Sequence, residues 1–383
     1  MQVIADTGEL ESFCQKLREQ PFVAVDTEFM REKTYWPVLC LIQAAADGIE
    51  AIIDPMAEGI DLQPFLDIMA DPKIVKVFHA ARQDVEIFVH LQNDTPKPIF
   101  DTQIAAMVCG FGDQIGYEPL MRNLLGAQID KGSRFTDWSR RPLSDQQLSY
   151  ALSDVTHLRD AYPILKKRLE ETDRLSWVED EMSRLVDPAL YLTDPSQAWR
   201  RLKLRGVRQA DVGPLMKLAE WREMEAQKRN LPRARIFKDD AILELARMKP
   251  KSVDELGRAR TVPNGFERSR QGAGVLAAVK EGRNVPREMA PRVERNQNRA
   301  PAPADVLELL KVVLKRQCEE FEVAPKLIAS SADLEMLALD PNADIPATKG
   351  WRRKVFGETA MSVMKGDLAL CLHDKRIELV KVR

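Results

Sequence analysis

The chain has 383 residues, of which 44% are hydrophobic, and its 57 Lys and Arg nearly balance 59 Asp and Glu, for a formal net charge of -2. This length suffices for two or three domains with ordinary cores, which indicates a soluble globular protein. No apolar run has the length of a membrane helix, and the first residues lack the basic and apolar regions of a signal peptide, so a membrane or secreted protein is excluded and a cytoplasmic location is expected.

The first ~170 residues alternate strand and helix signals, which predicts a mixed-sheet α/β domain. The expected strands are Pro21 to Phe29, Val38 to Ala46, Glu50 to Asp54, Ile74 to His79 and a short piece at Ile99 and Phe100. The first three suit an antiparallel meander, whereas the fourth follows a helix, Leu62 to Ala70, and can therefore pair in parallel. A long helix is expected after Ser144, because Ser144 and Gln147 can form a capping box at its start.

After Asp187 the pattern becomes wholly helical. The expected helices are Leu215 to Asn230, Asp240 to Met248, one capped by Ser252, Asp305 to Phe321, Ser331 to Leu339 and one near Gly357 to Met364. A segment rich in Pro, Asn and Arg separates the last three helices from the others, which indicates a linker. The expected domains are a mixed-sheet domain over 1–187, a helical domain over 205–288, a linker over 289–304 and a second helical domain over 305–383.

The charge is divided unevenly along the chain. Residues 200–288 contain 22 Lys and Arg against 12 Asp and Glu, whereas residues 1–199 contain 19 against 33. A basic segment beside an acidic one predicts a module that binds a polyanion, of which nucleic acid is the commonest. The alternative is that many of these charges only solvate helix faces.

Two acids stand at the end of the first buried strand. The stretch "FVAVDTEFM" begins as an apolar run at Phe22 and then carries Asp26 and Glu28. Because residues two apart share one face of a strand, the two carboxylates are expected to stand side by side. Like charges at that distance repel, and partial burial raises the cost, so we expect a cation between them.

Two further acids can complete this site. Asp84 lies in the first turns of a helix that follows a strand, and Asp154 lies on the long helix, one turn after Tyr150. Four carboxylates at one end of a sheet are stable only with divalent cations among them, and Mg²⁺ or Mn²⁺ suits oxygen ligands. The five cysteines are scattered singly and there are only four histidines, so neither residue type offers another ligand set.

This set of residues predicts phosphodiester hydrolysis. Two ions roughly 3.5–4 Å apart can activate a water and stabilise the leaving oxygen, and the Tyr150 phenol can orient that water or help to deprotonate it. Each motif alone also fits a solvated strand end, a helix N-terminus or a surface hydrogen bond. The order of the three motifs and the type of element that carries each one favour the catalytic interpretation.

The segments "VAVDTEF", "FHAARQD" and "YALSD" resemble the three motifs of the DEDD superfamily of exonucleases, in the branch with Tyr in the third motif and, within it, the ribonuclease D family. The resemblance implies a ribonuclease H-like fold, with two Mg²⁺ or Mn²⁺ ions held by Asp26, Glu28, Asp84 and Asp154 and a water activated by Tyr150. The segment before the third motif also resembles the family, at Asp130, Lys131, Asp137, Trp138, Arg141, Pro142 and Leu143.

The likeness extends over the rest of the chain. Leu215 to Gly257 resembles the HRDC domain, a small helical nucleic-acid-binding module, and the segment "GWRRKVFGETA" resembles a degenerate second copy of it. The family resemblance implies a monomeric 3′-to-5′ exoribonuclease that releases nucleoside 5′-monophosphates from transfer RNA precursors and other stable RNAs.

Three alternatives are weighed against this function. A DNA 3′-to-5′ exonuclease of the proofreading type would use the same acids and differ only at the contact with the 2′-OH. A catalytically inactive nucleic-acid-binding protein is disfavoured because all four acids and Tyr150 are present. A helicase is disfavoured because the chain has no Gly-x-x-x-x-Gly-Lys-Ser/Thr phosphate-binding loop.

Basic residues near a helix-turn-helix junction are the candidate phosphate contacts of the helical domain. They are Lys228, Arg229, Arg233, Arg235 and Lys238. Arg140 and Arg141 are candidates for contact with the scissile strand, with surface ion pairing as the alternative. Trp221 and Phe237 are expected in the core of the helical domain and not as stacking surfaces for bases, because both lie among apolar neighbours at helical spacing.

Overall fold

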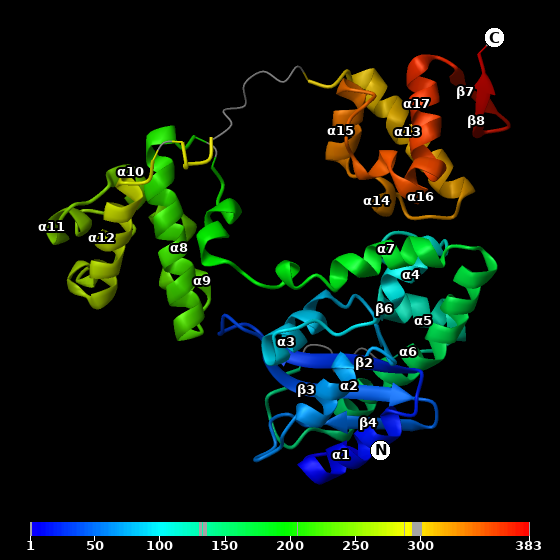
Figure 1. Cartoon of the computed structure of the whole chain (residues 1–383), viewed down its shortest axis with the longest axis horizontal. Coiled ribbons are helices and arrows are strands. Elements are labelled where there is room, and N and C mark those ends of the chain that lie inside the picture. Colours follow the sequence, from blue (N-terminus) through cyan, green and yellow to red (C-terminus); the bar gives the residue numbers. More distant parts are fainter. Residues whose placement is uncertain are drawn as a thin grey trace. The chain divides into compact units, whose positions relative to one another are not determined.

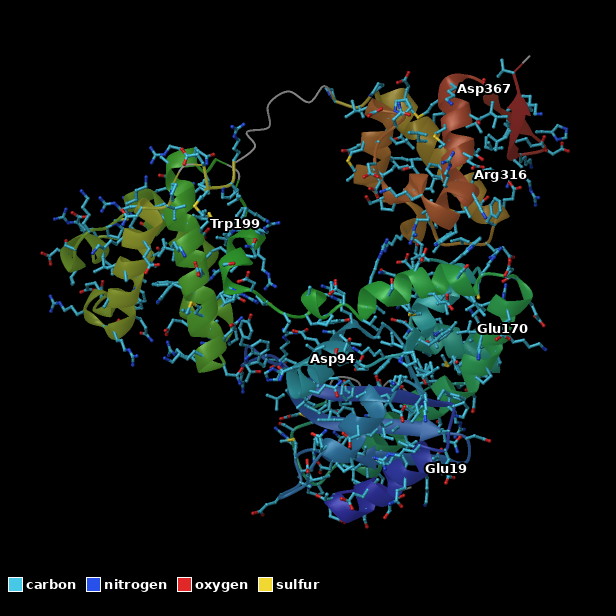
Figure 2. All side chains as sticks on the ribbon, viewed as in Figure 1. Glu19, Asp94, Glu170, Trp199, Arg316 and Asp367 are labelled. Atoms are coloured by element: carbon cyan, nitrogen blue, oxygen red, sulfur yellow. The ribbon has the colours of Figure 1, made fainter. Side chains whose placement is uncertain are left out.

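The computed structural model describes residues 2–129, 132, 136–204, 206–286, 288–292 and 301–382 (Figure 1). The chain forms two compact units. The first consists of Met1–Glu28, Leu41–Asp187 and Ala300–Arg383, and the second of Phe29–Cys40 and Pro188–Arg299. Asp130, Lys131 and residues 293–300, which are half of the predicted linker, lie outside the described residues. Figure 2 draws the side chains on the same view.

A six-stranded mixed sheet, in the order β1-β4-β3-β2-β5-β6, is the centre of the first unit. The strands are β1 (Val3–Ile4), β2 (Phe22–Met30), β3 (Val38–Ala46), β4 (Ile49–Ile53), β5 (Val75–Phe78) and β6 (Ile99–Asp101). The pairs β1/β4, β2/β5 and β5/β6 are parallel and β3/β4 is antiparallel. The expected mixed sheet is confirmed, with every expected strand end within one residue; β1 was not predicted, because two residues carry no detectable alternation.

Helices cover this sheet. They are α1 (Thr7–Leu17), α2 (Gln63–Ala70), α3 (Arg82–Gln92), α4 (Thr102–Val108), α5 (Tyr117–Leu125), α6 (Asp145–Glu171) and α7 (Leu175–Leu185). Helix α6 begins with the predicted capping box, in which Ser144 and Gln147 each accept a backbone N–H of the other, and it packs against β4 and β5. Among the described residues, none of the helices combines the length and the apolar character that crossing a bilayer needs.

The C-terminal part of the first unit has its own core. Its elements are α13 (Ala304–Glu320), α14 (Pro325–Ile328), α15 (Ser331–Leu339), α16 (Gly350–Arg352), α17 (Glu358–Lys365), β7 (Leu368–His373) and β8 (Arg376–Lys381). The expected helices are present, but the prediction of a wholly helical domain needs correction, because β7 and β8 form an antiparallel hairpin. The hairpin was missed because β7, LALCLH, is a short apolar run without polar alternation, and periodicity alone does not distinguish such a run from part of a helix.

This C-terminal part packs against α4 and α7. The rings of Trp177 and Trp351 are stacked, with centroids 4.6 Å apart and 6° between their planes. Arg352 forms an ion pair with Glu181 beside them, and both side chains are buried. The stack and the ion pair explain why residues at the C-terminus belong to the same compact unit as the sheet.

Helices of the second unit enclose a separate apolar core. They are α8 (Val212–Arg229), α9 (Arg233–Ile236), α10 (Asp239–Met248), α11 (Val253–Leu256) and α12 (Arg270–Arg283). Helices α8 and α12 approach closely at Gly213 and Gly282, since a Cβ atom on Gly282 would lie 2.4 Å from the Cα of Pro214. Phe237 is buried in this core and Trp221 packs against it, as predicted.

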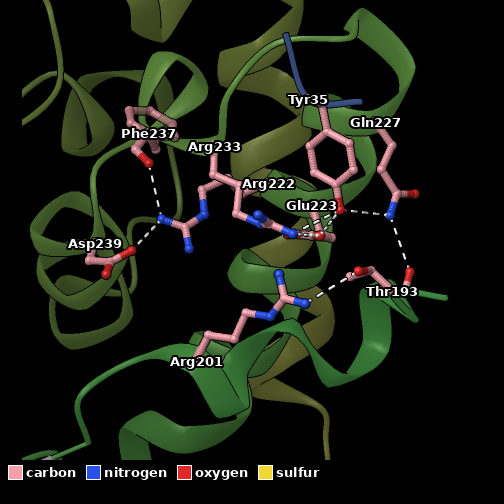
Figure 3. Close-up of polar contacts among 9 residues, drawn as sticks. All are labelled: Tyr35, Thr193, Arg201, Arg222, Glu223, Gln227, Arg233, Phe237 and Asp239. Atoms are coloured by element: carbon pink, nitrogen blue, oxygen red, sulfur yellow. Dashed lines mark hydrogen bonds and ion pairs between the residues drawn. The ribbon is translucent and has the colours of Figure 1, made fainter. Parts of the chain in front are cut away.

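A second part of this unit comes from the segment Phe29–Cys40, which packs on α8 through Tyr35 (Figure 3). The Tyr35 hydroxyl donates to the buried carboxylate of Glu223, and the Arg233 guanidinium donates to both oxygens of that carboxylate at 2.5 Å. Asn230 ends α8 in a left-handed conformation, and its Oδ1 accepts the backbone N–H groups of Tyr35 and Trp36 at 3.1 and 3.0 Å. The segment is therefore fixed to α8 by both side-chain and backbone contacts.

Candidate active site

Strand β2 places the first two acids. Val23, Ala24 and Val25 are fully buried, which anchors the strand in the sheet, and the chain is partly exposed again at Asp26 and Glu28. The carboxylate oxygens of Asp26, Glu28 and Asp154 lie within 4.8 Å of one another. The expected convergence of β2 and α6 is therefore present.

Asp84 contacts the same strand from α3. It is the third residue of that helix, it is only 7% exposed, and its carboxylate accepts a hydrogen bond from the Thr27 hydroxyl. Thr27 lies between Asp26 and Glu28 in the chain, so one strand end contacts or carries three of the four acids. Asp84 is not among the three acids whose oxygens form the tight group, which is the one difference from the predicted four-acid cluster.

Helix α6 carries both Asp154 and the tyrosine of the third motif. Asp154 is 8% exposed and the Tyr150 phenol, one helical turn earlier, is partly exposed beside it. The Tyr117 hydroxyl on α5 points at the backbone carbonyls of Ser153 and Asp154, with 3.0 Å to the former. The Trp138 ring lies behind Tyr150, with 6.2 Å between the ring centroids. Tyr117 thus holds this turn of α6, and Trp138 packs against the phenol of Tyr150.

The electrostatics of this cluster favour a bound cation. Burial raises the pKa of Asp26 to about 6, and burial together with the negative charge of Asp26 raises the pKa of Asp84 well above its usual range. Burial, the charges of Asp154 and Glu28, and a hydrogen bond with Asp154 raise the pKa of Tyr150. Negative charge is therefore costly here in the absence of a counter-ion, and oxygen ligands at this spacing suit a hard divalent metal.

Comparisons with known proteins agree with this site. Residues 1–170 match the 3′-5′ exonuclease family model, and residues 215–279 match the HRDC domain. The ribonuclease D of Granulibacter bethesdensis is 47% identical over 379 residues, which cover 99% of this chain and 96% of that protein. The ribonuclease D of Nitrobacter hamburgensis is 47% identical over 382 residues, the full length of both chains. The chain belongs to the ribonuclease D family.

The fold of the whole chain agrees with this family. The crystal structure of Escherichia coli ribonuclease D, described as an exoribonuclease involved in structured RNA processing, superposes with a TM-score of 0.81 at 29% identity. The match covers 95% of this chain and 98% of the other. The expected enzyme class, a 3′-to-5′ exoribonuclease of the ribonuclease D family, is confirmed.

The two arginines near the third motif of this ribonuclease D family member differ in their surroundings. The side chain of Arg140 is 83% exposed, with Nε 3.2 Å from the Asp137 carboxylate. Arg141 forms a bidentate pair with Asp54, in which both nitrogen-to-oxygen distances are 2.6 Å. Arg140 is therefore positioned as a surface residue, and Arg141 ties the segment before α6 to the end of β4.

The predicted basic residues of the helical unit also separate into two groups. Lys228, Arg229, Arg235 and Lys238 are exposed. Arg233 instead lies against the Tyr35 ring, 4.7 Å from its centroid, with its guanidinium bonded to Glu223 (Figure 3). The structure thus places Arg233, which is partly exposed, in a packing and ion-pair contact within the unit, and it leaves the other four more exposed.

Sequence reasoning did not single out several residues that contact the three motifs. Thr27, Tyr117 and Asp101 all contact the motifs, but each does so through a backbone group or a single hydroxyl. Such contacts have no characteristic spacing in a sequence. For Asp101 alone a signal was present, because an Asp directly before a helix is a common N-cap.

Proposed function

We propose that this enzyme shortens the 3′ ends of transfer RNA precursors and other stable RNAs, one nucleotide at a time, and releases nucleoside 5′-monophosphates. The observation that carries the proposal is the convergence of Asp26, Glu28 and Asp154, with Tyr150 beside Asp154. The proposal also includes a monomeric state and a cytoplasmic location, as expected from the sequence.

The four acids would hold two divalent ions, Mg²⁺ or Mn²⁺. When bound, such ions supply an activated water and stabilise charge on the leaving oxygen. The carboxylates of β2, α3 and α6 fix this cluster at the end of the sheet. Among them, Asp84 would act from the side of Thr27, since its carboxylate accepts the hydroxyl of that residue.

Tyr150 would position the attacking water. Its hydroxyl donates a hydrogen bond to the Asp154 carboxylate, which leaves a lone pair on the phenol oxygen to accept a hydrogen bond from a water molecule. The Trp138 ring and the turn held by Tyr117 restrict the movement of the phenol. A phenol restrained in this way would be able to orient the attacking water.

The helical unit would bind the body of the RNA. Lys228, Arg229, Arg235 and Lys238 are exposed cations in or next to α8, α9 and α10, and several could contact phosphates at once. Such contacts provide affinity that depends on salt and carry no base specificity. Arg140 would be the corresponding surface contact near the catalytic cluster.

The experiment that tests this proposal uses one transfer RNA precursor labelled at either end. A 3′ label should appear first as a mononucleotide, whereas a 5′ label should remain on a ladder of shortened products. A DNA oligonucleotide of the same sequence distinguishes the proposed function from that of a DNA exonuclease. Equal rates on RNA and DNA would favour an exonuclease of the proofreading type. Asp154→Asn is the control for contaminating nuclease, and internal cleavage products would contradict the proposal.

A further inference from the structure

One buried acid near the catalytic cluster has no role in the function proposed above. Asp101 ends β6, and its side chain is 3% exposed. The carboxylate accepts two N–H groups of its own helix α4, from Gln103 at 2.8 Å and Ile104 at 3.4 Å. It also accepts two N–H groups from a different part of the chain, Ala80 at 3.0 Å and Ala81 at 2.9 Å. One carboxylate therefore connects two helix starts.

The second pair of contacts falls on a strained turn. Ala80 has φ +59°, in the left-handed region, where a side chain with a Cβ atom is disfavoured and glycine is preferred. This turn is the whole connection between β5 and α3, because β5 ends at Phe78 and α3 begins at Arg82. Asp84 is in the first turn of α3, so the direction in which α3 leaves the sheet decides where the Asp84 carboxylate lies.

The residue after Asp101 holds the same connection. The Thr102 hydroxyl donates to the carbonyl of Phe78 at 3.0 Å and lies 3.0 Å from Nδ1 of His79. Parallel pairing of β5 and β6 aligns Phe78 with Asp101, which brings both side chains to the turn. Together Asp101 and Thr102 contact four successive residues, from Phe78 to Ala81.

We infer that Asp101 is a positioning residue, which holds the Ala80–Ala81 turn in its left-handed form and thereby sets the position of Asp84. The inference rests on the proposed function in one respect, the assignment of Asp84 as a metal ligand. The alternative is that Asp101 serves only as the N-cap of α4, in which case its removal would affect stability and not the metal site.

The test measures Mn²⁺ binding to the full-length protein without RNA, from the electron paramagnetic resonance signal of the free ion. An Asn at position 101 can keep Oδ1 as the acceptor for Ala80, Gln103 and Ile104, but its amide N–H₂ then faces the N–H of Ala81, which has lost its acceptor. Asp101→Asn should therefore release the turn at Ala81. The expected effect is about a tenfold loss of Mn²⁺ affinity, the size found when supporting partners of a metal ligand are changed.

A second substitution distinguishes geometry from charge. Because glycine adopts φ +59° without strain, the double variant Asp101→Asn with Ala80→Gly should regain most of the affinity that Asp101→Asn loses. If the loss came from removal of a negative charge near the metals, Ala80→Gly would restore nothing, and the inference would be wrong. Ala80→Val keeps Asp101 and disfavours the turn directly, so it should weaken Mn²⁺ binding even if Asp101→Asn does not fold.

Two controls complete the design. Asp6 caps α1 in the same way, with Oδ1 3.0 Å from the Glu9 N–H, so Asp6→Asn should lower the Tm and leave Mn²⁺ affinity unchanged. If Asp101→Asn behaves like Asp6→Asn, Asp101 is only a cap and the inference fails. Asp84→Asn tests the assignment on which the inference rests. Unchanged Mn²⁺ affinity in Asp84→Asn would reject Asp84 as a metal ligand, and with it both the inference and the four-acid metal site of the proposed function.

Discussion

Two regions of this molecule pair a tyrosine with an acid, and they balance the charge of that acid differently. In the second unit, Tyr35 and Arg233 both bond to Glu223; burial alone would raise its pKa, but these hydrogen bonds and the arginine charge outweigh burial and lower the pKa. In the catalytic cluster, Tyr150 bonds to Asp154, and burial raises the pKa of the neighbouring Asp26 to about 6. Burial therefore does not distinguish the two kinds of acid. The difference lies in the source of the positive charge, which is Arg233 for Glu223 and, under the proposed function, bound divalent ions for the cluster.

The largest expected effect concerns the acids themselves. Asp154→Asn removes a ligand charge and should abolish detectable release of nucleotides, whereas Glu223→Gln should leave the turnover of a dinucleotide within about twofold, because the latter acid lies outside the cluster. The measurement is initial rate on short RNA at saturating Mg²⁺, with circular dichroism to verify folding. Comparable losses in both variants would remove the distinction between the two regions.

The two tyrosines give the next largest effect. Tyr150→Phe retains the ring and loses the hydroxyl, so kcat should fall by roughly 10²–10⁴ while RNA affinity and Tm stay close to wild type. Tyr35→Phe should show the reverse, a lower Tm with kcat unchanged, because its hydroxyl bonds to Glu223, Gln227 and Arg233 of the second unit. A fall in RNA affinity with normal turnover of bound RNA would instead identify Tyr150 as a binding residue.

Removing the charge of one acid should change the free energy of unfolding in opposite directions in the two regions. An acid with a raised pKa destabilises the folded protein as the pH rises through its unfolded and folded pKa values, so Asp26→Asn should stabilise the metal-free protein above pH ~6, by about 1–3 kcal/mol. An acid with a lowered pKa stabilises the protein above its unfolded pKa, so Glu223→Gln should cost about 1–3 kcal/mol at neutral pH.

The effects of both substitutions on the free energy of unfolding should disappear at low pH. Once the pH is well below 3.8, the ordinary pKa of Asp26, this carboxyl is protonated in both the folded and the unfolded protein. The contribution of Glu223 is lost as the pH falls through its folded pKa. Urea unfolding in the presence of a chelator, at several pH values, measures the two curves. If both variants changed the free energy of unfolding in the same direction at pH 7, the two regions would not differ as described. Added Mg²⁺ should reduce the stabilisation caused by Asp26→Asn.

The smallest effect is expected from single surface cations. Arg229→Ala should reduce the slope of log affinity against log salt for a transfer RNA precursor by about one unit, with Lys73→Ala on the first unit as the matched control. Arg233→Ala should act mainly on Tm, since Arg233 bonds to Glu223. Equal slopes for wild type and Arg229→Ala would mean that Arg229 is only a solvated charge.

Much of the first domain could be predicted because its signals are local. The strand ends, the capping box of Ser144 and the placement of Asp84 at a helix start follow from alternation and turn chemistry over a few residues. The convergence of Asp26 with Asp154 needed one further premise, that the three motifs act together, which their order and the family resemblance supplied.

The remaining features depend on contacts between distant segments. The sequence presents Arg233 as one basic residue among five, and only the fold shows that Glu223 and Tyr35 surround it. The role of Asp101 depends on the register of β5 and β6, which aligns it with Phe78. Neither contact produces a pattern in the sequence, because the bonded groups are backbone atoms or side chains far apart along the chain.

The segment Phe29–Cys40 limits how this protein can be divided or recombined. It follows Glu28 directly in the chain, yet it is held by Asn230 and Glu223. A chimaera that receives the helical domain of a relative by exchange at Asp187 would therefore join a foreign α8 to a native Tyr35, and the two surfaces would not match. Grafting should succeed only when residues 29–40 are exchanged along with the helices, so these two stretches are expected to have diverged as one inherited block.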